Sequence, residues 1–382
     1  MKILAFCPYY PPHIGGLEKY SEELHERLVK EGHSIIVCTS AIPSTAQSIE
    51  RHGNITTYRF PAWEIIYNYP IPKFTSFAFW KLYKKAKEDQ CDVVISVTRF
   101  FVTTPIAYFV SRASKVPWLH IEHGSGYIVS SNWVVRFFGY LYDRVWSPFL
   151  FTRTSLTITP SRSAQAFVSQ FDSRPIPVIY RGFDYAALNA AVPNSALREK
   201  YADKAIITYA GRFIGSKGVS DLIRAFESVV KQIPSVLLLA GSGNQRGTIE
   251  QEVSQLGLQG SVEFIDEITP GEVLGLFQVS DIVVNPSYAE GLPTVVLEAA
   301  ACGVATVATD VGGTSEIVQH EISALLYRPG DIDSLTKNIH TLLQDPVLRA
   351  RLGHNAQRSV REKFNWDNAI DTYLQHFHSI IQ

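Results

Sequence analysis

The segment from Asn285 to Ala300 combines two carboxylates with an expected helix start. Pro293 suits the first position of a helix, because it has no N–H group to leave unpaired there. The free backbone N–H groups around Leu292 to Val295 would then attract an anion. Glu290 precedes this helix, and Glu298 lies roughly 7–8 Å along its axis. An anion at the helix start would therefore have a hydroxyl-binding carboxylate on either side, which fits a nucleotide sugar. The simpler alternatives are a favourable charge before a helix for Glu290 and an exposed helix residue for Glu298.

Local positive charge marks a second loop, which runs from Gly211 to Gly218. Arg212 offers a fork of hydrogen-bond donors and Lys217 a mobile point charge, a combination suited to two phosphates. On their own, two solvated loop cations would explain these residues equally well. A third loop ends in Gly15 and Gly16, before an amphipathic stretch. Paired glycines there let a ligand approach the backbone, although a tight turn would also require them.

Composition excludes several classes of protein. The chain has 382 residues, 46% hydrophobic and 19% charged, with a net charge of −1. This is a globular composition, and it argues against a nucleic-acid binder, which would carry a basic excess. The four cysteines are scattered singly, and no histidine and carboxylate cluster has metal-ligand spacing, so we expect no metal site. We also expect no signal peptide and no transmembrane helix, hence a cytoplasmic protein.

Charge and aromatic content divide the chain near residue 190. Residues 1–190 carry a net charge of +6 and hold 33 of the 45 aromatic residues, whereas the remainder carries −7. This shift predicts two domains, at 1–184 and 196–364, joined by a linker, with a final helix over 365–382 that crosses back to the first domain.

Short apolar runs alternate with helical patterns in both halves, which predicts an α/β protein with two parallel sheets. Ligands of such folds lie at the carboxyl ends of the strands, so we expect the site in a cleft between two facing Rossmann-like domains. The expected strands are Ile3–Cys7, Ser34–Thr39, Val93–Val97, Trp118–Ile121 and Leu156–Thr159, then Ile206–Ala210, Val236–Ala240, Val262–Ile265, Ile282–Asn285, Ala305–Ala308 and Ala324–Tyr327.

With these motifs together, the chain resembles glycosyltransferase family 4, the retaining transferases of the GT-B fold. The resemblance covers nearly the whole chain and is densest over residues 205–330. It rests on an E-x7-E element, a G-R-x(n)-K-G element and glycine-rich loops, which match Glu290 and Glu298, Arg212 and Lys217, Gly15-Gly16, Ala240-Gly241-Ser242-Gly243 and Gly312-Gly313-x-x-Glu316.

The resemblance implies roles for single residues. Glu290 would contact the transferred sugar, Glu298 would bind ribose hydroxyls, and His123 would line the sugar pocket. Without the family, His123 is better explained as a capped turn histidine. The diphosphate would be held by Arg212 and Lys217. The other implied donor contacts are Gly15, Gly16, Gly243, Gly291, Leu292, Pro293 and Thr294, and the backbone of Ile268 toward the base.

Two departures from the family pattern stand out. Arg181-Gly182 replaces a frequent Asn-Gly at the end of the first domain, which affects the hinge or the acceptor side. Asp266 replaces a common glycine and puts the base contact in question.

The implied activity is transfer of a sugar from a nucleoside diphosphate of the UDP or GDP type to an acceptor hydroxyl, with retention and without a metal. The acceptor would be a glycan or a lipid-linked molecule of surface polysaccharide or glycolipid synthesis. A non-catalytic sugar-nucleotide-binding regulator or subunit is the alternative, and a glycoside hydrolase is another. A nicotinamide-dependent oxidoreductase is disfavoured, because Gly247 falls one place late for a G-x-G-x-x-G motif.

Two stretches of the first half, 67–87 and 133–153, interleave aromatic and basic residues. Aromatic side chains beside cations are typical of a face that lies on an anionic bilayer. A buried helix with a solvated edge is the competing interpretation. The expected location is therefore the cytoplasm, with peripheral contact at the inner face of the cell membrane as a hypothesis.

Overall fold

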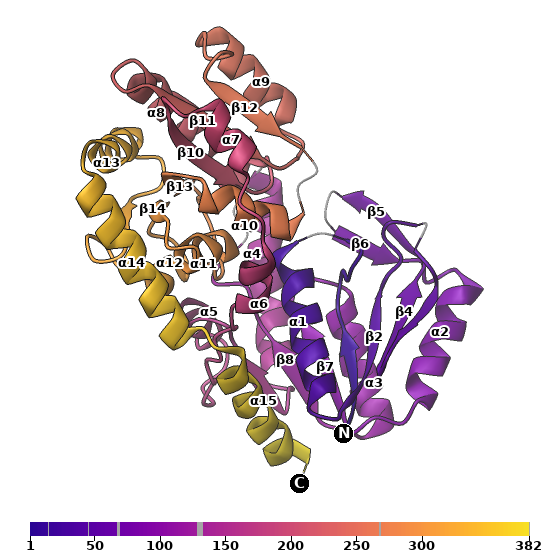
Figure 1. The fold of residues 1–382 in the computed structure, drawn as a ribbon. Coiled ribbons are helices and arrows are strands. Elements are labelled where there is room, and N and C mark those ends of the chain that lie inside the picture. The colour runs from indigo at the N-terminus through magenta and orange to yellow at the C-terminus, as the bar shows by residue number, and fades with distance from the viewer. Residues whose placement is uncertain (14, 45, 67–68, 128–132, 267–268, 382) are drawn as a thin grey trace. The chain divides into compact units, whose positions relative to one another are not determined.

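The computed structural model describes residues 1–13, 15–44, 46–66, 69–127, 133–266 and 269–381. The chain divides into two compact units, one of residues 1–128, 133–181 and 367–382, the other mainly of residues 182–366 (Figure 1). Each is described on its own. The elements of the first unit are β1 (Lys2–Phe6), α1 (Gly16–Lys30), β2 (Ser34–Ser40), β3 (Ile49–His52), β4 (Ile55–Phe60), β5 (Ala62–Ile66), β6 (Tyr69–Pro72), α2 (Phe77–Glu88), β7 (Val93–Val97), α3 (Thr103–Ser114), β8 (Trp118–Ile121), α4 (Trp133–Phe151), β9 (Leu156–Ile158), α5 (Arg162–Val168) and α15 (Trp366–Ile381).

The second unit follows the same strand and helix alternation. Its elements are α6 (Tyr185–Ala190), α7 (Ser195–Lys200), β10 (Ala205–Ala210), the 3-10 turn η1 (Gly215–Lys217), α8 (Val219–Val230), β11 (Ser235–Ala240), α9 (Arg246–Gln255), β12 (Val262–Ile265), α10 (Pro270–Gln278), β13 (Ile282–Asn285), α11 (Thr294–Ala301), β14 (Ala305–Thr309), α12 (Thr314–Ile317), β15 (Leu325–Tyr327), α13 (Ile332–Gln344) and α14 (Pro346–Lys363).

The sheet of the first unit has the strand order β3-β4-β2-β1-β7-β8-β9. All neighbouring strands are parallel except β3 and β4, which form an antiparallel pair. Leu4 and Phe6 of β1 pack in one core with side chains of α2 and α3. At the centre, β7 is buried along its whole length and β1 from Ile3 to Phe6, as is typical of parallel strands covered by helices.

The sheet of the second unit has the order β12-β11-β10-β13-β14-β15 and is parallel throughout. Its two faces bury separate cores. Helices α8, α9 and α13 pack on one face, and α10 and α11 pack on the other. The α/β architecture with two Rossmann-like sheets, predicted from the apolar runs, is confirmed.

Two features of the sequence interpretation need correction. The segment from Asp184 to Ser195, expected to be a linker, folds against the second unit. Its residues 185–190 form α6, and the Asn194 backbone N–H donates to the Gly275 carbonyl at 3.1 Å. Four strands, β3 to β6, were also missed. Among them β3 is exposed throughout, so it lacks the buried apolar run by which the others were found.

The final helix α15 packs on the first unit. The hydroxyl of Tyr373 shares a hydrogen bond with the hydroxyl of Tyr20 on α1, and both side chains are buried. Trp366, the first residue of α15, packs against Gly182. A Cβ atom on Gly182 would lie 2.2 Å from the Trp366 backbone nitrogen. In the Arg181-Gly182 pair, which differs from the Asn-Gly frequent in the family, close backbone packing therefore requires the glycine.

Candidate functional site

The loops that follow β10 and β13 pack tightly against each other in the second unit. The Tyr288 N–H donates to the Ser216 carbonyl at 2.8 Å. Gly218 has a φ of 65°, and a Cβ atom there would meet the Pro286 carbonyl oxygen at 2.1 Å. Only glycine fits this position, because it needs both a left-handed backbone and close approach. The packing brings the predicted cation of one loop beside the predicted carboxylate of the other.

Lys217 and Glu290 form an ion pair at the point where these loops meet. The Lys217 Nζ lies 2.6 Å from the Glu290 Oε1, with side-chain exposures of 21% and 11%. The pair spans 73 residues of sequence, yet both partners belong to the second unit. Because both side chains retain access to solvent, the ammonium group can exchange its carboxylate partner for a phosphate oxygen without leaving a buried charge unpaired.

Helix α11 begins at Thr294, directly after the Glu290 loop. The prediction that Pro293 is the first residue of the helix is wrong by one position, because Pro293 has an extended conformation and directly precedes the helix. Its carbonyl accepts a hydrogen bond from the Leu297 N–H at 3.2 Å. The N–H groups of the first turn of a helix point beyond its N-terminal end and have no partner within the helix, so an anion can bind there. Glu298 is the fifth residue of the helix and is half-buried. The predicted order of carboxylate, helix start and carboxylate is therefore present.

The glycines around Glu290 are held by backbone packing. A Cβ atom on Gly312, whose φ is 55°, would lie 2.0 Å from the Glu290 carbonyl oxygen. The neighbouring Gly313 N–H donates to the Gly291 carbonyl at 2.7 Å. The Gly312-Gly313 motif thus fixes the path of the loop that carries Glu290 and Leu292.

The loops after β10 and β11 are packed in the same way. Gly241 has a φ of 136°, and a Cβ atom there would lie 2.0 Å from the Gly211 carbonyl oxygen. A Cβ atom on Gly243 would lie 2.4 Å from the Phe213 carbonyl oxygen. Arg212 stands between these contacts, and its side chain is exposed. Gly243 therefore has a packing role, and Arg212 is free to move toward an anion.

In the first unit, His123 follows β8 and packs edge-on against the Tyr20 ring at 4.6 Å. Burial lowers the pKa of His123 to about 4, so the ring is neutral at pH 7. Its Nε2 atom is buried and has no hydrogen-bond partner among the described residues. A neutral ring nitrogen in this state is suited to a hydroxyl group of a ligand.

A buried ion cluster supports the His123 loop, and this cluster was missed by the sequence interpretation. Arg99 is fully buried and contacts Glu122 at 3.0 Å and Asp143 at 2.7 Å. Glu122 also accepts from the N–H groups of Arg99 and Gly124, at 2.9 and 2.5 Å. Despite burial, the positive charge of Arg99 lowers the pKa of Glu122 to about 2.

The cluster extends to further side chains of the same unit. His120 lies 3.2 Å from Glu122 and 2.8 Å from the Ser96 hydroxyl. Ser147 donates to Asp143 at 2.9 Å. The available signal was an Arg and a Glu directly after buried strands, but sequence alone does not show that they meet each other or Asp143 of a distant helix.

The glycine loop before α1 lies beside acidic and aromatic side chains of the same unit. The Glu18 carboxylate covers Gly15, since a Cβ atom there would lie 2.3 Å from its Oε2. His13 contacts the same carboxylate at 2.7 Å and stacks on Tyr9. Gly15 is extended, with a φ of 177°, so the tight-turn alternative does not explain it. Gly16 is the first residue of α1.

Several other predictions have a limited structural outcome. Ile268, the predicted base contact, lies outside the described residues. Within the described ranges, no group of three or more His, Cys, Asp or Glu side chains could hold a metal ion. Nor is any described helix long and apolar enough to cross a membrane.

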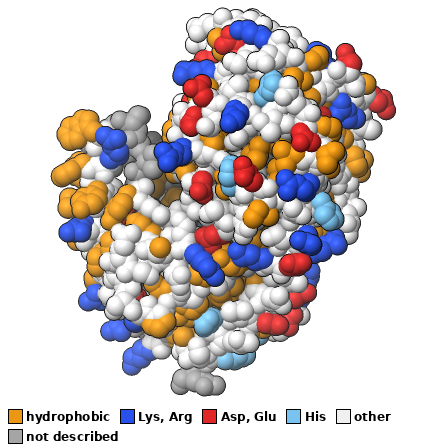
Figure 2. Space-filling view, turned by 90° about the vertical axis from the view of Figure 1, so that its left-hand side faces the viewer, with side chains coloured by type: hydrophobic (Ala, Val, Ile, Leu, Met, Phe, Trp, Pro, Cys, Tyr) orange, Lys and Arg blue, Asp and Glu red, His pale blue; other side chains and the backbone are white. Residues whose placement is uncertain are grey.

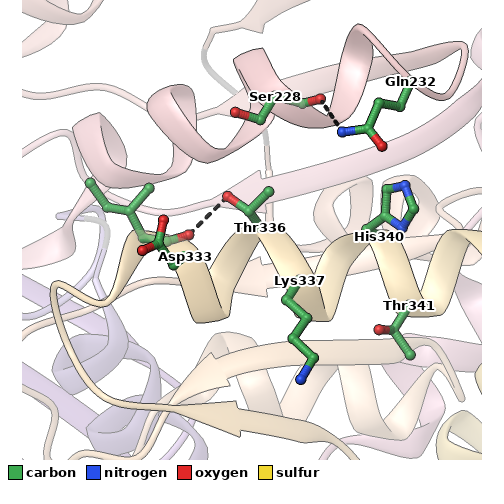
Figure 3. A pocket seen from close by; sticks show the side chains of 8 residues that line it. Ser228, Gln232, Asp333, Thr336, Lys337, His340 and Thr341 are labelled. Carbon is green, nitrogen blue, oxygen red and sulfur yellow. Dashed lines mark hydrogen bonds between the residues drawn. The ribbon is translucent and has the colours of Figure 1, made fainter.

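A groove between α8 and α13 contains none of the predicted site residues (Figure 3). It is lined by Ser228, Gln232, Ile332, Asp333, Thr336, Lys337, His340 and Thr341.

The aromatic stretches of the first unit are partly exposed on α2 and α4. On α2, Phe77 is 83% exposed. On α4, the exposed apolar side chains are Trp133, Phe137, Phe138, Tyr140, Leu141 and Val145. Arg136 and Arg144 of the same helix are exposed beside them. Hydrophobic and basic side chains also lie next to one another in the surface view (Figure 2). Each helix also has a buried face, at Phe79 of α2 and at Leu150 and Phe151 of α4.

Two parallel-sheet units of this kind are typical of the GT-B fold. A structure of Anabaena Alr3699/HepE in complex with UDP-glucose has the same fold, with a TM-score of 0.80, 22% identity, and coverage of 99% of this chain and 100% of that one. The model "Glycosyltransferase Family 4" matches residues 14–187, and "Glycosyl transferases group 1" matches residues 194–359. The chain therefore belongs to glycosyltransferase family 4.

Curated relatives agree with this assignment. An uncharacterised glycosyltransferase of Methanocaldococcus jannaschii is 27% identical, over 100% of this chain and 99% of its own length. A GDP-mannose-dependent monoacylated α-(1-6)-phosphatidylinositol monomannoside mannosyltransferase of Corynebacterium glutamicum is 25% identical, over 96% of this chain and 95% of its own length.

Proposed function

We propose that this glycosyltransferase moves a sugar from a nucleoside diphosphate donor to an acceptor hydroxyl with retention of configuration and without a metal ion. The observation that carries the proposal is the Lys217–Glu290 pair at the start of α11. A diphosphate would be held there by the positive charge of Lys217 and Arg212 and by the first N–H groups of the helix. Glu290 and Glu298 then flank the diphosphate as acceptors for sugar and ribose hydroxyls.

The residues of the second unit support the departure of the diphosphate. As the bond to the sugar breaks, the leaving phosphate gains negative charge. Lys217 and Arg212 stabilise that charge more in the transition state than in the bound donor, which lowers the barrier. Glu290 is a sugar contact in this scheme and not a nucleophile. We propose front-face attack, in which the leaving phosphate takes the proton of the acceptor hydroxyl.

The acceptor is proposed to be a glycan or a lipid-linked molecule, reached by peripheral contact of the first unit with an anionic bilayer. Exposed aromatic side chains beside Arg136 and Arg144 on α4 support this placement, because such faces bind to the membrane interface. The relative from C. glutamicum, by its name, uses GDP-mannose and a phosphatidylinositol mannoside. The proposed location is therefore the cytoplasm, at the inner face of the membrane.

A thermal-shift panel with UDP, GDP, ADP and NAD, each with and without EDTA, tests the donor site. A ligand at about one hundred times its Kd stabilises the folded protein by roughly 2.7 kcal/mol, which gives a measurable shift. We expect a shift with a nucleoside diphosphate that EDTA does not change, that Lys217→Met reduces, and that Lys337→Met on the distant α13 leaves intact.

The remaining outcomes each remove a part of the proposal. A shift with NAD alone, or with none of the four, would eliminate the donor site. A shift that EDTA abolishes would eliminate metal independence. Binding without transfer to any acceptor, and without slow release of sugar from the matching nucleotide sugar, would favour a non-catalytic regulator. The anomeric configuration of the product, read by NMR, tests retention.

A further inference from the structure

The carboxyl ends of β10, β11 and β12 lie level with one another at the edge of the second sheet. Ala210 is the register partner of Ala240, and Ala240 is the partner of Ile265. The next residues of the three strands are Gly211, Gly241 and Asp266. Neighbouring strands are about 4.8 Å apart, so the phosphate loop at β10 and the end of β12 are separated by roughly 10 Å. This is comparable to the distance from a 5′-diphosphate to the base of the same nucleotide.

Backbone packing fixes the loops on both sides of the phosphate loop. Beyond β13, the Gly313 N–H donates to the Gly291 carbonyl at 2.7 Å. Toward β11, a Cβ atom on Gly241 would lie 2.0 Å from the Gly211 carbonyl oxygen. From a diphosphate held beside Lys217, the row of strand ends toward β12 leads to the charged side chain of Asp266.

An oriented carboxylate stands at that end of the row. The Arg246 Nη1 donates to the Asp266 Oδ1 at 2.5 Å, and the Asp266 side chain is 62% exposed. The Arg246 guanidinium lies over the Phe264 ring at 4.0 Å and is also bound to Glu250 at 2.6 Å. Phe264 and Glu250 thus fix the position of Arg246, and Arg246 in turn fixes one oxygen of Asp266. The Asp266 carboxylate remains exposed to solvent.

We propose that Asp266, positioned by Arg246, selects guanine as the base of the donor. A carboxylate can only accept hydrogen bonds. Guanine presents two adjacent donors, N1–H and the N2 amino group, which match both carboxylate oxygens. Uracil presents a single N–H between two carbonyl oxygens, and adenine presents a donor beside an acceptor. Both of those edges place an acceptor against the carboxylate, which disfavours them.

This inference rests on the proposed function and deepens it, since it names the donor as a guanosine diphosphate sugar. The test is the Kd of the full-length protein for GDP and for UDP by titration calorimetry. We expect wild-type protein to bind GDP at least about tenfold more tightly, the value of one charge-assisted hydrogen bond. Asp266→Asn should weaken GDP, strengthen UDP and bring the ratio close to one.

Two further variants sharpen the result. Arg246→Met leaves the carboxylate in place but unpositioned, so the ratio should fall part of the way. Asp333→Asn removes an exposed carboxylate on α13, remote from the row, and should leave the ratio unchanged. Circular dichroism of each variant checks that the fold is retained.

Failure of this inference is distinguishable from failure of the proposed function. Equal binding of GDP and UDP, a preference for UDP, or an unchanged ratio in Asp266→Asn would overturn the guanine assignment and leave the donor site standing. Absence of binding by any nucleoside diphosphate would overturn both.

Discussion

The two units place ionisable groups at the same structural position, the carboxyl ends of parallel strands, but in opposite states. In the first unit, Arg99 and Glu122 follow β7 and β8, are fully buried and are bound to each other, and Arg99 also binds Asp143. In the second, Lys217 and Glu290 follow β10 and β13, remain partly exposed, and form an ion pair with each other.

This difference teaches which charges can serve a ligand. Removing one partner of a buried ion pair leaves the other charge unpaired in a region of low dielectric constant, so such a pair cannot exchange partners while the protein is folded. A pair that keeps contact with solvent loses less when it opens than a fully buried pair, so its partner can be exchanged at lower cost. We therefore interpret the Arg99 cluster as a scaffold for the His123 loop, and the Lys217–Glu290 pair as the part that responds to the donor.

The largest expected effect is the loss of the buried cation. Arg99→Met leaves Glu122 and Asp143 without their partner, and we expect it to lower the free energy of unfolding of the first unit by about 3–5 kcal/mol. Urea denaturation followed by tryptophan fluorescence measures this, because five of the six tryptophans precede residue 190. Arg144→Met, an exposed cation on the same helix as Asp143, is the matched control and should cost no more than about 0.5 kcal/mol. A loss below about 1 kcal/mol in Arg99→Met would remove the distinction between the two regions.

The next effect concerns binding and spares stability. Lys217→Met removes a hydrogen bond from a charged donor to phosphate, so we expect a nucleoside diphosphate to bind roughly 10- to 100-fold more weakly. The free energy of unfolding should change by less than about 1 kcal/mol, because the pair is partly exposed. Titration calorimetry and urea denaturation on the same preparation give both values. Unfolding as severe as that of Arg99→Met would show that Lys217 is structural.

Much of this comparison is visible in the sequence, and its limits have physical causes. The Lys217 and Glu290 loops were predictable, because buried strands, glycines and a helix start are local patterns. The meeting of Lys217 with Glu290 was not, since it depends on how two loops separated by 73 residues pack. The Arg99 cluster was missed for the same reason: a polar residue after a strand gives no sign of burial until its partners from other elements are known.

A smaller effect follows from the pKa of His123, which burial lowers to about 4 from an ordinary value near 6.5. Between these two values the unfolded chain takes up a proton that the folded chain does not, so stability rises with pH across that window. His123 should account for a loss of about 1–2 kcal/mol between pH 7 and pH 5, less than full burial would give because the residue is only half-buried. Urea denaturation at pH 7, 6 and 5 should show this component in wild-type protein and not in His123→Asn. His354→Asn, an exposed histidine of the second unit, is the control; equal pH slopes in all three proteins would contradict the prediction.

The smallest expected effect concerns binding of the first unit to an anionic membrane. It tests whether the exposed cations of the first unit bind a bilayer, as the cations of the second unit are proposed to bind a nucleotide. A cation near an anionic bilayer contributes about 1 kcal/mol, so Arg136→Gln on α4 should weaken binding to phosphatidylserine vesicles about fivefold. Lys84→Gln on α2 should act similarly, because Lys84 is 77% exposed and its partner Glu88 is a weak competitor at 3.6 Å. Lys337→Gln in the second unit should leave binding unchanged, and neutral vesicles should bind more weakly than anionic ones. If wild-type protein does not sediment with anionic vesicles, or if Lys337→Gln weakens binding as much as Arg136→Gln, then these charges are ordinary solvated groups and the acceptor reaches the enzyme from solution.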